Sequence, residues 1–257
     1  MTLDVAISTY RPEGIKRVEK MLPQPQEGVR YVVSWQEHED TPIPESLMIR
    51  DDVEVYRLEL KGLSNNRNNA INHCKGDIIL IADDDLIYYP GFAEKIKEAY
   101  QRYPAMDVAT FKLDYLNKKI YPPKDCKLKL PFPKNYYLSS VELTFRREKL
   151  KDLKFKKELG LGNKWLGCGE DEFFLIEAIK EGFDCRFVNE TIGIHPLEST
   201  GDKVCPGILR GQGYVIRKIY PYSGILRIAL KAKRLGKVTG GNFIKILYHL
   251  FQGFVTR

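Results

Sequence analysis

The sequence predicts a mostly parallel, doubly wound α/β sheet that is followed by a basic helical extension. Four short apolar runs rich in β-branched residues lie in the first third of the chain, at residues 3–8, 29–34, 53–58 and 77–82. Segments with a helical pattern separate or follow these runs, at residues 14–21, 64–74 and 91–101. Strands that alternate with helices favour a parallel sheet covered on both faces. A chain of 257 residues, 43% of them hydrophobic, is long enough to bury the core of one catalytic domain.

The later elements continue this architecture. Further strands are expected at residues 106–113, 139–147, 184–188 and 191–195. The Pro-rich, irregular segment at residues 117–137 is expected to form an active-site flap. A helix is expected over residues 169–183, where Gly182 closes it. We therefore place a catalytic domain at residues 1–204 and a basic amphipathic helical extension at residues 205–257.

The charges are distributed unevenly along the chain. The net charge is +7, but no Asp or Glu follows Asp202. Residues 203–257 carry eleven cations, which leaves a net charge of −4 for the rest of the chain. These cations are Lys203, Arg210, Arg217, Lys218, Arg227, Lys231, Lys233, Arg234, Lys237, Lys245 and Arg257. An acidic body with a strongly basic tail predicts an anionic partner for the tail.

The cysteines and the first residues predict a cytoplasmic protein. The five cysteines are scattered and form no C-x-x-C pattern, which is typical of a reducing compartment and argues against a zinc site or a disulfide framework. The first residues lack a basic segment followed by a long apolar run. No stretch reaches the ~18 consecutive apolar residues expected of a membrane-spanning helix.

Three consecutive carboxylates, Asp83–Asp85, directly follow the apolar run at residues 77–82. In open α/β sheets, ligands bind beyond the carboxyl ends of the strands. The helix expected from Ser64 runs antiparallel to this strand and brings Arg67 to the same rim, where Arg11 also follows the first strand. Arginines and a helix N-terminus suit phosphate, and carboxylates suit a hard divalent cation. A metal-bridged nucleoside diphosphate satisfies both sets of charges, whereas a solvated acidic loop or a calcium site remains the alternative.

At these residues the chain resembles the family 2 glycosyltransferases of GT-A fold, over roughly residues 2–200. The segments that carry the resemblance are "AISTYRP" in the first strand, "GLSNNRNNAI" at the Arg-Asn helix, and "ILIADDDLIYYPG" at the DxD segment. The resemblance implies a nucleotide-sugar site formed by Thr9, Arg11, Arg67, Asn68, Asp83 and Asp84, and we add Trp35 and Gln36 to this predicted site. It also implies that Asp85 is the principal ligand of Mn²⁺ or Mg²⁺.

One segment departs from the family pattern. The family usually carries an Asp-rich, base-reading segment after the second strand, where this chain has "SWQEHED". Trp35 could stack on the base and Gln36 could hydrogen-bond it. This departure leaves the nucleotide open, and UDP is preferred on the family resemblance alone.

A second acidic motif, "GEDEFF", places Glu170 and Asp171 at the start of a helix. Acids in a first helical turn can simply complement the helix dipole. Family members carry a Glu-Asp pair here, which implies that Asp171 is the general base and that Glu170 binds the acceptor or orients the base. His195, 24 residues beyond Asp171, matches a frequent further metal ligand, although a structural role for this imidazole is the alternative.

The resemblance implies an inverting, metal-dependent glycosyltransferase that uses a nucleotide-diphospho-sugar and acts on a glycan or lipid-linked glycan acceptor in surface polysaccharide biosynthesis. Two other functions remain open. One is a nucleotidyltransferase on a related α/β fold, although "AISTYRPEG" lacks the Gly-rich phosphate loop of those enzymes. The other is a non-enzymatic module that binds a membrane surface and has a structural calcium site.

The basic tail contains two amphipathic patterns, at residues 223–237 and 242–254. In the second, Phe243, Ile246, Leu247, Leu250 and Phe254 share one expected face. A cationic polar face without acids is typical of an interfacial helix on anionic lipid. We expect residues 222–257 to hold the protein at the inner face of the cell membrane, with packing on the catalytic domain as the alternative. Nucleic acid is not expected as a partner, because no binding motif is present and the body is acidic.

Overall fold

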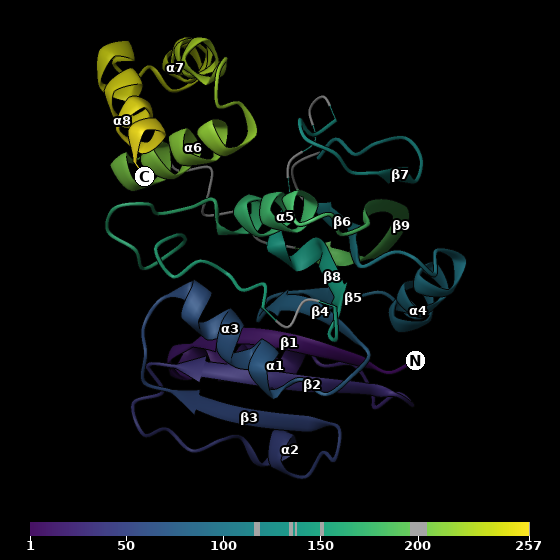
Figure 1. Cartoon of the computed structure of the whole chain (residues 1–257). Coiled ribbons are helices and arrows are strands. Elements are labelled where there is room, and N and C mark those ends of the chain that lie inside the picture. Colours follow the sequence, from purple (N-terminus) through teal and green to yellow (C-terminus); the bar gives the residue numbers. More distant parts are fainter. Residues whose placement is uncertain (116–118, 134–135, 137, 150–151, 196–204, 257) are drawn as a thin grey trace. The chain divides into compact units, whose positions relative to one another are not determined.

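The computed structural model describes the chain apart from residues 116–118, 134–135, 137, 150–151, 196–204 and 257 (Figure 1). The chain divides into two compact units. The first comprises Met1–Lys61, Asn65–Lys154 and Ala178–Glu198. The second comprises Gly62–Ser64, Phe155–Glu177 and Ser199–Arg257. Residues 155–177, which the sequence assigned to the catalytic domain, therefore group with the helices of the tail.

The first unit contains a mixed sheet with the strand order β3-β2-β1-β4-β8-β6-β9-β5, and β7 pairs with β9. Four neighbouring strands are parallel: β1 (Leu3–Tyr10), β2 (Val29–Gln36), β3 (Val53–Leu58) and β4 (Ile78–Asp83). β8 (Leu143–Arg146) lies antiparallel between β4 and β6 (Val108–Tyr115). β9 (Cys185–His195) is parallel to β6 and antiparallel to the two-residue strands β5 (Ile87–Tyr88) and β7 (Cys126–Lys127).

The helices of this unit are α1 (Arg11–Met21), α2 (Glu45–Met48), α3 (Leu63–His73) and α4 (Phe92–Arg102), and the first two residues of α3 belong to the second unit. The core is built mainly from the aliphatic residues of β1, β2 and β4, with side chains of α1 and α4 packed on them. Strands buried on both faces require continuous apolar runs, which is why these strands were recognisable in the sequence.

Two expectations about the strands are wrong. Residues 139–147 do not form one strand, because Ser140–Glu142 make a 3₁₀ turn whose N-cap is Ser139, and the strand begins at Leu143. The two strands expected at 184–188 and 191–195 are one strand, β9. Irregularities in the pairing of β6 with β9 accommodate the polar residues between them. Part of the flap expected at 117–137 lies outside the described residues.

The second unit contains the start of α5 (Glu170–Lys180) and the three helices α6 (Pro206–Ile219), α7 (Gly224–Thr239) and α8 (Phe243–Val255). The three tail helices surround a small apolar core formed by Leu209, Ile228, Ala232, Ile246, Leu250 and Phe254. None of the helices in the described part of the chain has the length and hydropathy of a membrane-spanning segment.

Helix α6 also holds the turn that precedes α5. Gly167 donates its backbone N–H to the Gly207 carbonyl at 3.0 Å, and Arg210 donates from Nε to the Trp165 carbonyl at 2.8 Å. The Cys168 thiol donates to the Ile208 carbonyl at 3.3 Å. These bonds tie the tail helices to the loop that leads into Glu170.

Glycines allow α6 and α8 to approach closely. A Cβ at Gly213 would overlap the Leu250 carbonyl, and a Cβ at Gly253 would overlap the Arg210 carbonyl. We expect Gly213→Ala to lower the free energy of unfolding by about 1–3 kcal/mol, because overpacking forces two rigid backbones apart. Gly207→Ala in the same helix is the matched control, since a Cβ there meets its nearest atom at 3.6 Å. Thermal unfolding of both variants checks this; equal stability would show that the crossing tolerates a side chain.

Candidate active site

The register of the parallel strands brings the acidic segment beside the end of β1. Ser8 pairs with Asp83 across β1 and β4, so Thr9 lies next to the point where the chain leaves the sheet. Asn66 of α3 donates to the Thr9 carbonyl at 2.8 Å and fixes the first turns of α3 at the same edge. The carboxyl ends of β1 and β4 and the first turns of α3 therefore converge at Asp83–Asp85.

The Asp84 carboxylate faces α1 and accepts hydrogen bonds from Arg17 and Thr9. Arg17 donates from Nε to Oδ1 at 2.9 Å and from Nη2 to Oδ2 at 3.0 Å. The Thr9 hydroxyl donates to Oδ2 as well. A Cβ at Gly14 would overlap Thr9 and crowd Asp84, so the glycine leaves the space that these contacts need. The structure thus gives both Asp84 and Thr9 a bracing role at the positions predicted for nucleotide contacts.

Asp83 pairs with Arg67. The Arg67 Nη2 atom lies 3.3 Å from Asp83 Oδ1, and the Arg67 side chain is only 2% exposed. The Asp83 side chain is 32% exposed, so part of this carboxylate stays open to solvent or a ligand. Arg67 therefore lies where the sequence placed it, beside the aspartates.

Asp85 lies beside His195 because of the short strand β5. After Asp85 the chain pairs antiparallel with the end of β9, with Ile87 opposite Ile194. His195 Nε2 comes to 3.5 Å from Asp85 Oδ1, a buried oxygen that has no hydrogen-bond partner. Burial raises the pKa of Asp85, and the charges of the neighbouring aspartates add to the rise, whereas His195 opposes it.

These two groups fit a divalent cation. A carboxylate oxygen and an imidazole nitrogen are both suitable donors for Mn²⁺. The buried oxygen without a hydrogen-bond partner is the kind of group that an ion would satisfy. Within the described residues, no group of three or more His, Cys, Asp or Glu side chains could hold a metal. Other coordination positions would therefore fall to water or to oxygens of a bound ligand.

Trp35 and Gln36, which were predicted to contact the base, are both buried. Trp35 is fully buried and donates from Nε1 to the Arg11 carbonyl at 2.9 Å. A ring without exposed surface cannot stack on a base, so the stacking predicted for Trp35 is not supported. Gln36 is buried and donates from Nε2 to the Leu60 carbonyl. Arg11 is exposed, and its Nε lies 3.4 Å from the Glu37 carboxylate.

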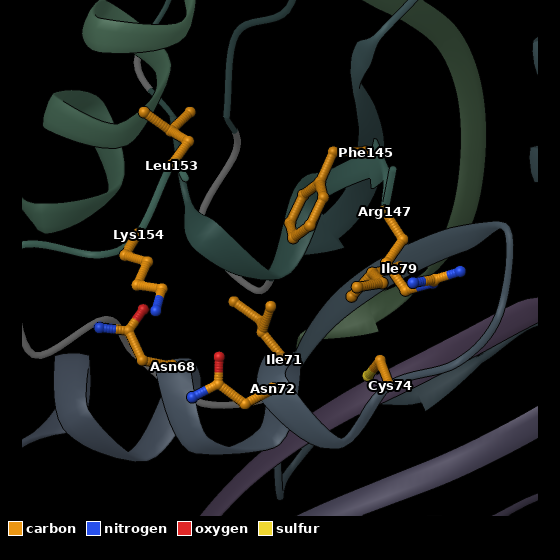
Figure 2. Close-up of a pocket in the computed structure, with 9 residues that line it drawn as sticks. All are labelled: Asn68, Ile71, Asn72, Cys74, Ile79, Phe145, Arg147, Leu153 and Lys154. Atoms are coloured by element: carbon orange, nitrogen blue, oxygen red, sulfur yellow. The ribbon is translucent and has the colours of Figure 1, made fainter. Parts of the chain in front are cut away.

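Asn68 faces a cavity of about 140 Å³ between α3, β4 and the residues that follow β8 (Figure 2). Figure 2 shows its amide near the ammonium of Lys154. The cavity is also lined by Ile71, Asn72, Cys74, Ile79, Phe145, Arg147 and Leu153. None of the aspartates of the acidic segment lines it. Asn68 therefore faces a space that those carboxylates do not share.

Glu170 and Asp171 begin α5 in the second unit. Gly169 precedes them with φ +95°, and Glu170 is buried with its carboxyl group against Gly160, whose φ is +94°. A side chain at Gly160 would crowd that carboxyl group. Asp171 is half-buried. A buried glutamate beside a half-buried aspartate is consistent with one positioning group and one group that can reach a ligand.

A comparison with protein families gives a match to part of the chain. Residues 42–157 match the model of "Glycosyl transferase family 2". The predicted likeness to the family 2 glycosyltransferases is confirmed. The matched family 2 range contains Arg67 and the three aspartates, whereas Asp171 and His195 lie outside it. No curated protein matches the chain in sequence.

The fold of this chain is shared by solved structures of S. aureus TarS. TarS 1–349 aligns with a TM-score of 0.65 and 16% identity, over 99% of this chain and 81% of that one. TarS 1–349 in complex with UDP-GlcNAc aligns with a TM-score of 0.66 and 17% identity, over 99% of this chain and 82% of that one. A further TarS structure aligns with a TM-score of 0.62 and 18% identity, over 92% of this chain and 43% of that one. The predicted GT-A fold with C-terminal helices is confirmed.

Three residues that shape this site were not predicted from the sequence: Gly14, Arg17 and Gly193. Arg17 lies in α1, where a charged residue of an amphipathic helix is usually expected to face solvent. Gly193 lets β5 approach β9, since a Cβ there would meet the Ile87 carbonyl oxygen at 2.5 Å. Only the pairing of β5 with β9 shows that this glycine sets the position of Asp85.

We expect Gly193→Val to weaken ligand binding through Asp85 without touching it. The added side chain pushes β5 from β9 and separates the Asp85 carboxylate from His195. The expected result is a loss of at least about tenfold in Mn²⁺ affinity, the range seen when groups that orient metal ligands are changed. Calorimetry measures it. The control is Gly182→Ala, where a Cβ meets nothing within 4 Å although φ is +88°. Unchanged affinity in Gly193→Val would exclude this positioning role.

Proposed function

We propose that the chain is a metal-dependent, inverting glycosyltransferase that takes a sugar from a nucleotide-diphospho-sugar, with UDP as the preferred nucleotide. The observation that carries the proposal is one sheet edge where Asp83 meets Arg67 and Asp85 meets His195. A buried arginine suits a diphosphate, and a carboxylate–imidazole pair suits a divalent cation. Support for UDP comes from the shared fold, because the TarS structures include complexes with UDP-GlcNAc and with UDP.

In this proposal Arg67 and the first turn of α3 bind the diphosphate, while Arg17, Thr9 and Gly14 hold the acidic segment in place. Asp85 and His195 would hold Mn²⁺ or Mg²⁺, which would supply positive charge to stabilise the leaving diphosphate. Asp171 removes the proton of the attacking acceptor hydroxyl, a role taken from the family resemblance. The acceptor is a glycan or a lipid-linked glycan of a surface polysaccharide, and the enzyme acts in the cytoplasm at the inner face of the cell membrane.

A donor panel tests this proposal. The full chain is incubated with UDP-, GDP- and dTDP-sugars and Mn²⁺, and nucleotide release is measured with and without EDTA. We expect release from a UDP-sugar that stops in EDTA. If thermal unfolding shows stabilisation by Ca²⁺ alone and by no nucleotide, the chain is the calcium-containing binding module. If added pyrophosphate instead converts the nucleotide-sugar to a nucleoside triphosphate and a sugar 1-phosphate, the chain is a nucleotidyltransferase.

A further inference from the structure

Helix α8 is apolar on two sides. One side, which includes Ile246, Leu250 and Phe254, packs within the three tail helices. The other side presents Ile244, Tyr248, Phe251 and Val255, which recur at the i, i+4, i+7 and i+11 spacing of a single helical face. We call these four residues the outer stripe of α8. Ile244 is 73% exposed and the other three are between 46% and 57% exposed.

Helix α7 has a similar outward face. Ile228 and Ala232 are buried in the tail core, whereas Leu226 and Leu230 are 67% and 61% exposed. The same spacing continues along that face to Lys233 and Lys237, both exposed. More than half of the exposed large hydrophobic side chains among the described residues lie between Tyr222 and Val255. Apolar exposure concentrated in this way marks an interaction surface and not scattered surface residues.

The charges around these faces restrict the partner. The exposed cations of α7 and α8 are Arg227, Lys233, Arg234, Lys237 and Lys245. No acidic residue occurs after Asp202. A second copy of the same surface would bring like charges together, which opposes self-association. An anionic lipid surface satisfies both the cations and the apolar side chains.

We propose that the outer stripe of α8, with the exposed face of α7, inserts into the headgroup region of an anionic bilayer. This face differs from the one that the amphipathic pattern indicated, since Ile246, Leu250 and Phe254 are used for packing inside the tail. Tyr248 and Phe251 are aromatic residues of the kind that anchor helices at a membrane interface. The inference rests on the proposed function in one respect, namely that a lipid-linked acceptor would share the surface to which the enzyme binds.

The experiment uses point variants in the full chain, because deleting α7 and α8 would expose the tail core and release α6. Flotation is measured with phosphatidylcholine vesicles, and with vesicles that also contain phosphatidylglycerol, at low and high salt. The wild-type chain is expected to float with anionic vesicles, less so at high salt because surface charges are screened. Ile244→Ser/Phe251→Ser should abolish flotation. Lys233→Glu/Lys237→Glu should reduce partitioning at least about tenfold, since the loss of each cation near an anionic surface costs roughly fivefold in partitioning.

Matched controls exist in the first unit. Met48→Ser/Ile49→Ser removes two exposed apolar side chains, and Lys16→Glu/Lys20→Glu reverses two exposed charges at the same i, i+4 spacing. Both should float like the wild type, and all four variants should melt like the wild type because the positions are exposed. Failure of the wild type to bind anionic vesicles overturns the inference, as does equal flotation of the stripe variant. A concentration-dependent dimer that Ile244→Ser/Phe251→Ser dissociates would assign the face to a second copy.

Donor binding separates this inference from the proposed function. Calorimetry of UDP with Mn²⁺ requires no membrane and should be unchanged in the stripe variant. Loss of flotation with intact UDP binding would leave the glycosyltransferase proposal standing. Flotation without any nucleotide binding would retain the membrane surface and reject the enzyme.

Discussion

Asp85→Asn is expected to abolish the metal dependence of UDP binding and to reduce turnover on the order of 10²-fold or more, because a bound ion supplies several kcal/mol of charge stabilisation. The substitution removes an anionic donor and leaves the shape of the side chain almost unchanged. Calorimetry of UDP with Mn²⁺ and with EDTA measures the effect. For the wild type, Mn²⁺ should tighten binding, and for the variant the two titrations should coincide.

The same variant should be more stable than the wild type in the absence of metal. Asp85 Oδ1 is buried without a hydrogen-bond partner, and its neighbours are carboxylates. Replacing a buried carboxylate by a neutral amide relieves desolvation and repulsion, so the melting temperature in EDTA should rise. Asp51→Asn, at an exposed position outside the site, is the control and should change neither the melting temperature in EDTA nor the metal dependence of UDP binding. Metal-dependent UDP binding that survives in Asp85→Asn would remove this residue from the metal site.

Asp171→Asn is expected to keep donor binding and lose transfer. A general base acts on the acceptor proton in the transition state, and its removal typically costs ~10²–10⁴-fold in rate. UDP affinity measured by calorimetry should equal that of the wild type, while sugar transfer to the acceptor falls. This combination separates a catalytic group from a residue that only stabilises the fold.

Two further variants sharpen this result. Glu170→Gln should be milder and should mainly raise the KM for the acceptor, because the family resemblance gives Glu170 the role of binding the acceptor or orienting the base. Glu158→Gln, at an exposed position of the same unit, should behave like the wild type. If Asp171→Asn retains a near-normal kcat, the Glu-Asp pair serves the helix dipole and the base lies elsewhere.

The parallel half of the sheet was predictable because its physical signature is local. A strand buried on both faces needs an unbroken aliphatic run, and the runs of β1, β2 and β4 meet that need. The meeting of Arg67 with the aspartates also followed from simple geometry, since a helix antiparallel to a strand of similar length returns to the same edge. The short strand β5 carries no such signature, so the approach of Asp85 to His195 rested on the family resemblance.

Other features needed the folded chain because the sequence pattern was ambiguous. Trp35 ends a buried strand, where alternation alone does not say whether the ring points into the core or the site; it points into the core. Arg17 reads as a surface residue of an amphipathic helix, yet its guanidinium reaches Asp84. In α8 two faces are apolar, and the sequence pattern alone does not show which of them packs inside the tail and which is exposed.

The pairing of the aspartates has a consequence for the order in which ligands bind. Among the described residues, Asp83 forms an ion pair with Arg67 and Asp84 with Arg17, whereas Asp85 pairs with His195. A divalent cation bound at one carboxylate and one imidazole would leave a local surplus of positive charge, which attracts a diphosphate. Under the proposed function, metal and nucleotide are therefore expected to be thermodynamically coupled, each weak alone and tight together. By reciprocity, any factor by which Mn²⁺ tightens the binding of UDP must equal the factor by which UDP tightens the binding of Mn²⁺.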